Sequence, residues 1–475
     1  MPREWDALNR KTIDFLKEGK FQEALESANE AVELARRIGD RRHLAVGLNN
    51  LGEVYQAIGD FAGAEQSLLA SIDVYGHEDA ETFTPLHSLA ALYADLKRHA
   101  EAEALFRREV SGREKQPSAD SAELAWGLLG LAESVQAQGR NDEVRRHLER
   151  VVALLEKSSG EAHPDLGSVL VYLAGTYQNE KRWEEARNIL RRALKLYEDS
   201  VGSGSPAFAE TLSRLAENYL AEGIVQAAEP LLEQAISILK ACRLPADDPG
   251  IARMTEKLAL LYLKSGQNDK ADQRLKEAIV IYGKALGEEH PALAQARNTL
   301  GESCLSQGRT DEARQLFETS LKAREAALGT NHPAVAQSLN NLAVLLGSNG
   351  QFADAESLHS RALDIRRKHF GQRHPAVTQS LENLAAIYHE AGKSQEAEDL
   401  LREAVAILEE NMGKDHPSTA LACFNLGTLL AARNKRLESA ELLWRYRKIL
   451  VGDQDRQEGK KYADGTLGGK QQRAT

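Results

Sequence analysis

The sequence predicts an all-α solenoid built from stacked helical hairpins. A segment that begins Asn331-His332-Pro333 returns almost intact at Arg373-His374-Pro375. The prolines at 291, 333, 375 and 417 are each 42 residues apart, and a fixed period of this length is typical of repeat proteins. Aromatic residues make up only 5% of the 475 residues, so Leu, Ala and Ile must fill the core, which suits helices. A solenoid also accommodates this length, because each repeat packs only on its neighbours.

Each repeat is anchored on a Leu-Ala or Leu-Gly pair. An aromatic or aliphatic residue follows the leucine after four positions, and a small residue follows nine positions later, as in Leu173, Tyr177 and Ala186. Residues four apart lie on one face of a helix. A degenerate first repeat fits around Leu8, which makes eleven candidate repeats. The other anchor leucines are Leu51, Leu89, Leu131, Leu173, Leu215, Leu258, Leu300, Leu342, Leu384 and Leu426.

The ends of the helices are also marked. The second helix begins with acidic residues such as Asp354 and Glu396, which complement the positive end of the helix dipole. A glycine after the first helix indicates a C-terminal cap with positive φ. These glycines are Gly59, Gly139, Gly223, Gly266, Gly308, Gly350 and Gly392. Later in the second helix a small residue is expected to seat against the next first helix, at Ala193, Ala235, Ala278, Ser320, Ala362 and Ala404.

This pattern resembles the tetratricopeptide repeat family, whose usual repeat has 34 residues. The 42-residue repeat with a His-Pro start and the run Ser-Leu-Asn-Asn-Leu-Ala is most similar to the kinesin light chain type. The resemblance covers residues 5–450, and it implies a right-handed superhelix of about eleven hairpins with a concave peptide-binding groove. We expect degenerate repeats over 1–160 and regular repeats over 161–450, continuous with the first. Residues 451–475 have almost nothing apolar to bury, which predicts a disordered tail.

Composition narrows the class of protein. The formal net charge of −11 disfavours nonspecific binding to nucleic acid or to an anionic membrane. No window approaches the ~18 apolar residues of a membrane span, and the first residues do not form a secretory signal. The three cysteines, Cys242, Cys304 and Cys423, are sparse and far apart, which fits a reducing compartment. A cytoplasmic protein is therefore expected.

The recurring His-Pro pairs have two interpretations. In the first, histidines at the same position of five repeats bind a row of metal ions. A helix start is the stronger interpretation, because proline suits the first helical position and pushes the residue before it out of the helical region. Equivalent histidines one repeat apart are also too far to share a metal at ~2.1 Å, so no metal or cofactor is predicted. The five histidines are His163, His290, His332, His374 and His416.

Asparagines before the anchor leucine are the better candidates for a binding site. We call the position two residues before the leucine the first slot, and the position directly before it the second slot. In the family, this face of the first helix lines the concave groove and holds bound peptides. An amide carries both donors and an acceptor, so it can pair with any peptide backbone; alternatively, it bonds within the solenoid. The asparagines are Asn49, Asn298 and Asn340 in first slots and Asn50, Asn341, Asn383 and Asn425 in second slots.

The middle repeats carry different residues in the second slot, namely Tyr172, Arg214, Lys257 and Thr299, with Arg253 one turn before Lys257. The cations could form a basic stretch for an acidic peptide, or a charged face in contact with solvent, and both interpretations stay open. No run of three repeats supplies the Lys and Asn set with which the family clamps a C-terminal carboxylate. We therefore expect no chaperone-tail clamp.

No catalytic motif is present: there is no GxxxxGK[ST], HExxH or GxSxG sequence and no EF-hand spacing. We therefore expect not an enzyme but a protein-protein interaction scaffold, which binds a peptide or protein segment in the groove and is a monomer or weakly self-associating. The light-chain resemblance implies a cargo or motor adaptor as an alternative. Against it, the chain leaves no room for the heptad segment of a light chain proper. A self-associating structural protein is the other alternative.

Overall fold

The computed structural model describes residues 2–76, 80–116, 121–159, 165–242, 245 and 247–450. These residues form 22 α-helices and two short 3₁₀ helices, with no strand among them. The predicted all-α solenoid class is confirmed, and the helices pair into the expected eleven hairpins. None of the helices within these ranges has the length and apolar character needed to cross a membrane. The predictions for His163-Pro164 and for the tail over 451–475 fall outside the described residues.

Contacts divide the chain into two compact units, Met1–Cys242 and Arg243–Thr475. The first unit holds six hairpins: α1 (Pro2–Lys17) and α2 (Phe21–Ile38), α3 (Arg41–Ile58) and α4 (Phe61–Tyr75), α5 (Phe83–Asp95), preceded by η1 (Ala80–Thr82), and α6 (His99–Glu114), α7 (Ser121–Gln136) and α8 (Asn141–Ser159), α9 (Leu166–Asn179) and α10 (Trp183–Ser200), and α11 (Pro206–Ala221) and α12 (Val225–Ala241).

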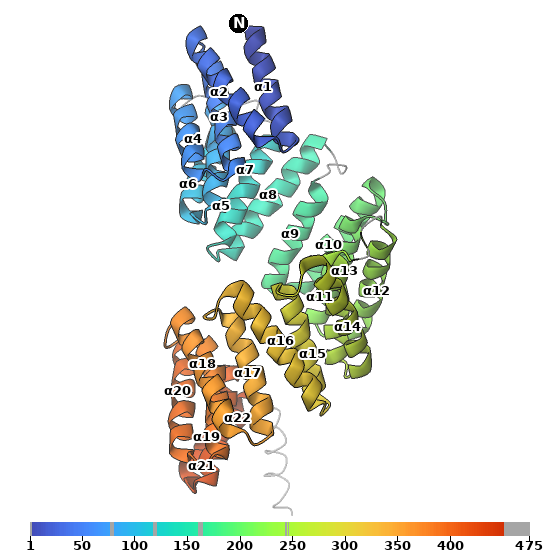
Figure 1. The fold of residues 1–475 in the computed structure, drawn as a ribbon, viewed down its shortest axis with the longest axis vertical. Helices are drawn as coiled ribbons and strands as arrows, with labels where there is room; N and C mark the ends of the chain where they lie inside the picture. The colour runs from blue at the N-terminus through green and yellow to red at the C-terminus, as the bar shows by residue number, and fades with distance from the viewer. Residues whose placement is uncertain are drawn as a thin grey trace, which may run out of the picture. The chain divides into compact units, whose positions relative to one another are not determined.

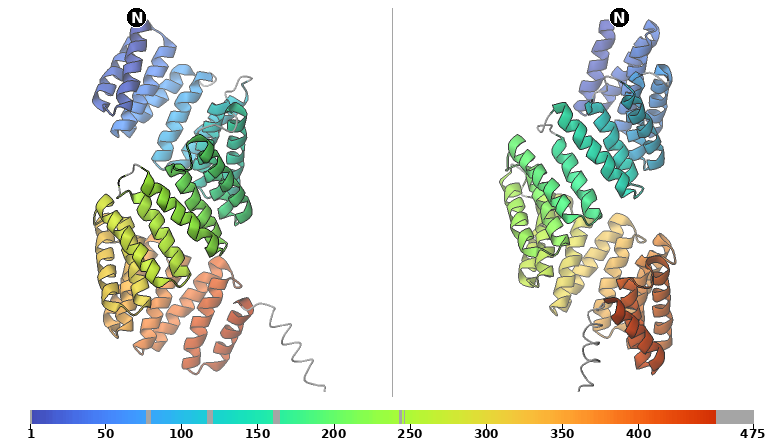
Figure 2. Two further views of the ribbon diagram at one scale, coloured as in Figure 1. Left: turned by 90° about the vertical axis from the view of Figure 1, so that its right-hand side faces the viewer. Right: turned by 180° about the vertical axis from the view of Figure 1, so that it is seen from behind.

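The second unit holds the other five hairpins: α13 (Pro249–Lys264) and α14 (Asn268–Leu286), α15 (Pro291–Ser306) and α16 (Thr310–Leu328), α17 (Pro333–Ser348) and α18 (Phe352–Phe370), α19 (Thr378–Glu390), preceded by η3 (Pro375–Val377), and α20 (Ser394–Met412), and α21 (Pro417–Ala432) and α22 (Arg436–Leu450). Within each unit a helix packs on its hairpin partner, and the second helix packs on the next first helix (Figures 1 and 2). The predicted boundary between residues 160 and 161 concerned the regularity of the repeats and stays a prediction.

Small residues let the helices of each hairpin approach closely. The small residue predicted at the start of the second helix is fully buried throughout, for example at Ala64, Ala186 and Ala397. In three repeats the anchor pair carries glycine instead of alanine, at Gly52, Gly301 and Gly427, and a side chain of the second helix lies against it. A Cβ added at Gly52 would lie 2.7 Å from Leu68 Cγ, and one added at Gly301 would lie 2.6 Å from a ring carbon of Phe317. At these anchors glycine therefore lets the side chain of the second helix approach the backbone of the first.

The turns between the helices follow the predicted glycine pattern. All seven predicted glycines have positive φ, between 70° and 85°. Three repeats have no glycine at this point, and Lys97, Lys181 and Asn434 take positive φ there, at 62°, 59° and 59°. The turn is thus kept even where an L side chain must enter the left-handed region, which costs free energy for any residue but glycine.

The described His-Pro pairs start helices, as predicted. In His290, His332, His374 and His416 the imidazole Nδ1 accepts a hydrogen bond from the backbone N–H two residues later, each at 3.1 Å. The following proline takes the first helical position. Each of these side chains therefore caps a helix with a nitrogen that carries no proton. Among the described residues, no three His, Cys, Asp or Glu side chains are grouped so that they could hold a metal ion.

Candidate functional site

The first slots of the predicted site lie mostly inside the stack. Asn49, Asn298 and Asn340 are only 6%, 0% and 4% exposed. The amides of Asn49 and Asn298 donate hydrogen bonds to Glu53 Oε1 and Glu302 Oε1 of their own helices, at 3.0 Å and 2.8 Å. These contacts fit the alternative interpretation, in which the amide forms hydrogen bonds within the solenoid.

Asn340 is held at both ends of its amide. Its Nδ2 donates to Ser380 Oγ of the next first helix at 3.3 Å, and its Oδ1 lies 2.8 Å from His359 Nδ1. Burial, and to a smaller extent the charge of Arg366, lowers the pKa of His359 to about 4. The imidazole is therefore neutral near pH 7 and donates its Nδ1 proton to the amide. Asn340 links α17, α18 and α19.

The second slots are more accessible. Asn50, Asn341, Asn383 and Asn425 are half-buried, whereas the anchor leucine beside each of them is buried. Neighbouring repeats are connected along this line of residues. For example, Asn341 Nδ2 donates to Glu302 Oε1 of the preceding first helix at 2.5 Å, and Asn50 Nδ2 donates to Asn9 Oδ1 at 2.6 Å.

Two adjoining pockets follow this line in the second unit. The α17–α19 pocket has a volume of about 720 Å³ and contains Asn340, Asn341 and Asn383. The α19–α21 pocket has a volume of about 380 Å³ and contains Asn383 and Asn425. Asn383 lines both. The structure therefore gathers four of the ten predicted residues onto one strip, across α17, α19 and α21.

The α17–α19 pocket also contains a cation that the sequence analysis missed. Arg366 of α18 donates from Nη1 to Ser380 Oγ at 2.8 Å, and no carboxylate among the described residues pairs with it. Burial lowers the pKa of Arg366. A sequence signal was present, because Arg324 stands 42 residues before Arg366, so that an arginine recurs at one repeat position. Arg324 is buried, at 2% exposure, and Arg366 is half-buried. The candidates predicted from the sequence all lie on first helices, whereas both arginines lie on second helices.

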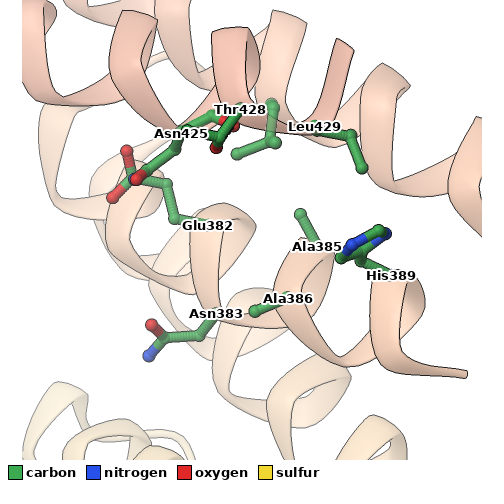
Figure 3. A pocket seen from close by; sticks show the side chains of 9 residues that line it. Glu382, Asn383, Ala385, Ala386, His389, Asn425, Thr428 and Leu429 are labelled. Atoms are coloured by element: carbon green, nitrogen blue, oxygen red, sulfur yellow. Dashed lines mark hydrogen bonds between the residues drawn. The ribbon is translucent and has the colours of Figure 1, made fainter. Parts of the chain in front are cut away.

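The α19–α21 pocket combines a carboxylate with an apolar wall (Figure 3). Glu382 lies at the first slot of α19, is half-buried and accepts a hydrogen bond from Asn425 of α21. Burial raises the pKa of Glu382, and the hydrogen bond from Asn425 offsets this only in part. In Figure 3 the Glu382 and Asn425 side chains lie together at one end of the pocket, and His389 lies at the other. The apolar wall consists of Ala385, Ala386, Leu401 and Leu429.

The first unit has a pocket of about 430 Å³ beside the second slots of α9 and α11. It is lined by Tyr172 and Arg214, two residues that the sequence analysis singled out. The Arg214 guanidinium lies between two carboxylates of its own helix, 3.5 Å from Glu210 Oε1 and 3.4 Å from Glu217 Oε2. Much of its charge is therefore already compensated.

The remaining predicted cations and Thr299 lie elsewhere. Arg253 is exposed and Lys257 is half-buried, both on α13 of the second unit, and neither lines any of the three pockets above. Thr299 is buried at 4% exposure. The predicted basic stretch is thus divided between the two units, with Arg214 in the first and the other two cations in the second.

Comparison with known proteins identifies the class of these repeats. The model of the tetratricopeptide repeat family matches residues 7–77, 81–157, 165–241, 250–326, 296–368, 334–410 and 375–449. The chain therefore belongs to the tetratricopeptide repeat family, which confirms the family resemblance. A solenoid of this family is a protein-interaction scaffold.

Solved structures similar to the chain include proteins of the kinesin light chain type. BtubC (BKLC) from P. vanneervenii is 29% identical over 48% of this chain and 89% of its own, with a TM-score of 0.42. A Podosopora anserina protein, described as a kinesin light chain with nearly identical repeats, is 30% identical over 43% of this chain and 96% of its own, with a TM-score of 0.39. No curated protein matches the chain.

Proposed function

We propose that the second unit binds an extended segment of a partner protein along α17, α19 and α21. The observation that carries this proposal is that two adjoining pockets share Asn383 and together present the second-slot amides of Asn341, Asn383 and Asn425. These three residues are spaced by 42 in the sequence. They present the same chemical group on successive first helices, as a ligand with a repeating backbone requires.

The repeat distance of the strip suits an extended chain. The helices α17, α19 and α21 contact one another in order, and packed helices lie about 8–10 Å apart. An extended peptide advances roughly 3.3–3.6 Å per residue. Each asparagine would therefore meet the backbone of the segment about once every three residues, and the side chains in between would enter the two pockets.

The test is a selection of phage-displayed random dodecapeptides on the immobilised 475-residue chain. The peptides enriched by the natural chain are then synthesised, and their affinity is measured by titration calorimetry. Replacing Asn341, Asn383 and Asn425 together by Ala removes up to three hydrogen bonds, so the affinity should fall by roughly ten- to a hundredfold.

The matched control is Asn50→Ala, which removes an amide from the same slot in the first unit. This change should leave the affinity unchanged, and the helical content of both variants, measured by circular dichroism, should equal that of the natural chain. An unchanged affinity in the triple variant, or an equal loss in Asn50→Ala, would reject the strip as the binding site.

A further inference from the structure

We infer that the α19–α21 pocket selects a basic side chain, lysine or arginine, of the bound segment. This inference rests on the proposed function, since it names the residue class that one pocket of the strip recognises. It assigns Glu382 as the acceptor for the charge and the wall at Ala385, Ala386 and Leu429 as the contact for the aliphatic stem.

Glu382 lacks the cationic partners that a half-buried carboxylate needs. Among the described residues, no Lys, Arg or His forms an ion pair with it, and its hydrogen-bond partner is the neutral amide of Asn425. The buried carboxylate of Glu398, on the next helix, shows the contrast, because it pairs with Arg402, Arg433 and Lys435. A charge that is partly removed from water and unpaired is unfavourable, so a ligand cation at Glu382 would relieve this cost.

The shape of the pocket fits a long side chain with a charged end. The volume of about 380 Å³ leaves room for one such side chain. Lysine and arginine bury their methylene stems along apolar surface while the charged group stays in a polar place. In Figure 3 the alanines and Leu429 flank the pocket, and Glu382 closes one end together with Asn425.

Other ligand side chains fit less well. An acidic side chain would meet the like charge of Glu382, and an apolar one would cover this carboxylate without pairing it. The adjoining α17–α19 pocket contains Arg366, which has no carboxylate partner among the described residues and repels a basic side chain. The two pockets therefore differ in charge, so a basic residue of the segment also fixes the register in which the segment binds.

The experiment repeats the dodecapeptide selection with two variants of Glu382. The natural chain should enrich peptides with Lys or Arg at one fixed position. Glu382→Gln keeps the shape of the side chain and should abolish this preference, and Glu382→Lys should replace it by a preference for Asp or Glu. The control is Glu390→Lys, which makes the same change of charge on the same helix at an exposed residue outside the pocket. This control should select the same peptides as the natural chain.

A selected peptide and its norleucine analogue then give a quantitative test. Glu382→Gln should weaken binding of the basic peptide by about tenfold or more, since a hydrogen bond to a charged group is lost, and should leave the analogue unaffected. If the selected peptides contain no basic residue, or if Glu382→Lys selects the same peptides as the natural chain, the pocket assignment is wrong while the strip can stand. If the natural chain enriches no peptides, the proposed function itself fails.

Discussion

The two units make the same contact between successive repeats, but the arrangement of charge differs, and some contacts of the first unit are reversed. In eight second helices, four in each unit, the residue directly after the fully buried residue near the helix start contacts the turn of the next hairpin. In the second unit three of the four residues at this position are acids with basic partners, as in Glu356 with Lys393 at 2.6 Å and Asp272 with Arg309. The fourth is Arg314, which donates a hydrogen bond to Gln351 at 2.9 Å. In the first unit two of the contacts are reversed, with Arg145 bonded to Glu180 at 3.0 Å and Arg187 bonded to Glu222.

The reversal shows that the position does not require a particular residue, because acid and base can exchange places. Two of the first unit's contacts, Glu65 with Arg98 and Glu103 with Arg140, have the same arrangement as those of the second unit. Coulomb attraction is symmetric in the two charges, so exchanging acid and base leaves the attraction unchanged. The repeats can therefore vary at this position in pairs while the hairpins stay in place.

The largest effect is expected at Glu398, the most buried acid of the series. The side chain is 3% exposed, and three cations pair with it. Removing one partner of a buried ion pair typically costs about 3–5 kcal/mol, because the other charges lose their compensation. Glu398→Gln should therefore lower the free energy of unfolding of the last two hairpins by about this amount, as measured by hydrogen exchange in α21 and α22.

The control for Glu398→Gln occupies the same position one repeat earlier. Glu356 and Lys393 have side chains that are 31% and 43% exposed, and an exposed pair contributes no more than about 1 kcal/mol. Glu356→Gln should thus have a small effect. A similar loss in both variants would show that burial does not decide the strength of this contact.

Acid should remove the difference between the natural chain and Glu398→Gln. Burial opposes ionisation of Glu398, but hydrogen bonds from Lys435 and Arg402, and the charges of Arg433 and Lys435, outweigh it and hold the pKa of Glu398 below its usual range. A lowered pKa stabilises the fold above the unfolded-state value of about 4.3, and this contribution is lost as the pH falls through the folded-state pKa. Unfolding measured from pH 7 downward should show the two proteins converging below about pH 4. A constant difference would contradict this.

Features that recur at a fixed spacing could be predicted from the sequence. Contacts between charged side chains of different repeats could not. The anchor leucines, the seven turn glycines and the His-Pro helix starts recur at fixed intervals, so a single chain reveals them. The contact at Arg187 was invisible, because its charge differs from that of its counterpart Glu398 and its partner Glu222 is 35 positions away. The pocket residues Arg366 and Glu382 were missed for a related reason, since both look like solvated charges until the packing of neighbouring hairpins shows them partly buried.

A smaller effect, a gain in stability, is expected when Asn218 is replaced. This asparagine is buried in the first unit, and the equivalent position is apolar in most repeats. Asn218 is 0% exposed, and neither Nδ2 nor Oδ1 has a hydrogen-bond partner among the described residues. Equivalent positions hold the buried leucines Leu261, Leu345 and Leu429. An unsatisfied buried amide costs about 1–3 kcal/mol, so Asn218→Leu should raise the free energy of unfolding by an amount of this order.

The second unit provides the matched control for Asn218. Asn340 is also buried but is bonded at both ends of its amide, so Asn340→Leu should destabilise the protein, since it leaves His359 without its partner. Urea denaturation of both variants measures the two effects. If both substitutions destabilise, the amide of Asn218 has a partner in solution, such as a water molecule.

The smallest expected effect comes from reversing one contact of the first unit. Arg187→Glu places two carboxylates together, and Glu222→Arg places two guanidinium groups together, so each single change should be destabilising. The double variant restores an attractive pair with the charge arrangement of the second unit. The coupling energy between the two sites, from urea denaturation of all four proteins, should be about 1 kcal/mol in favour of the double variant. Arg187 also lies 5.5 Å from the centre of the Tyr219 ring, and this contact is lost in the double variant, so full recovery is not expected. If the double variant were as unstable as the sum of the single changes, the position would require its particular residues, and the two units would differ in more than the sign of their charges.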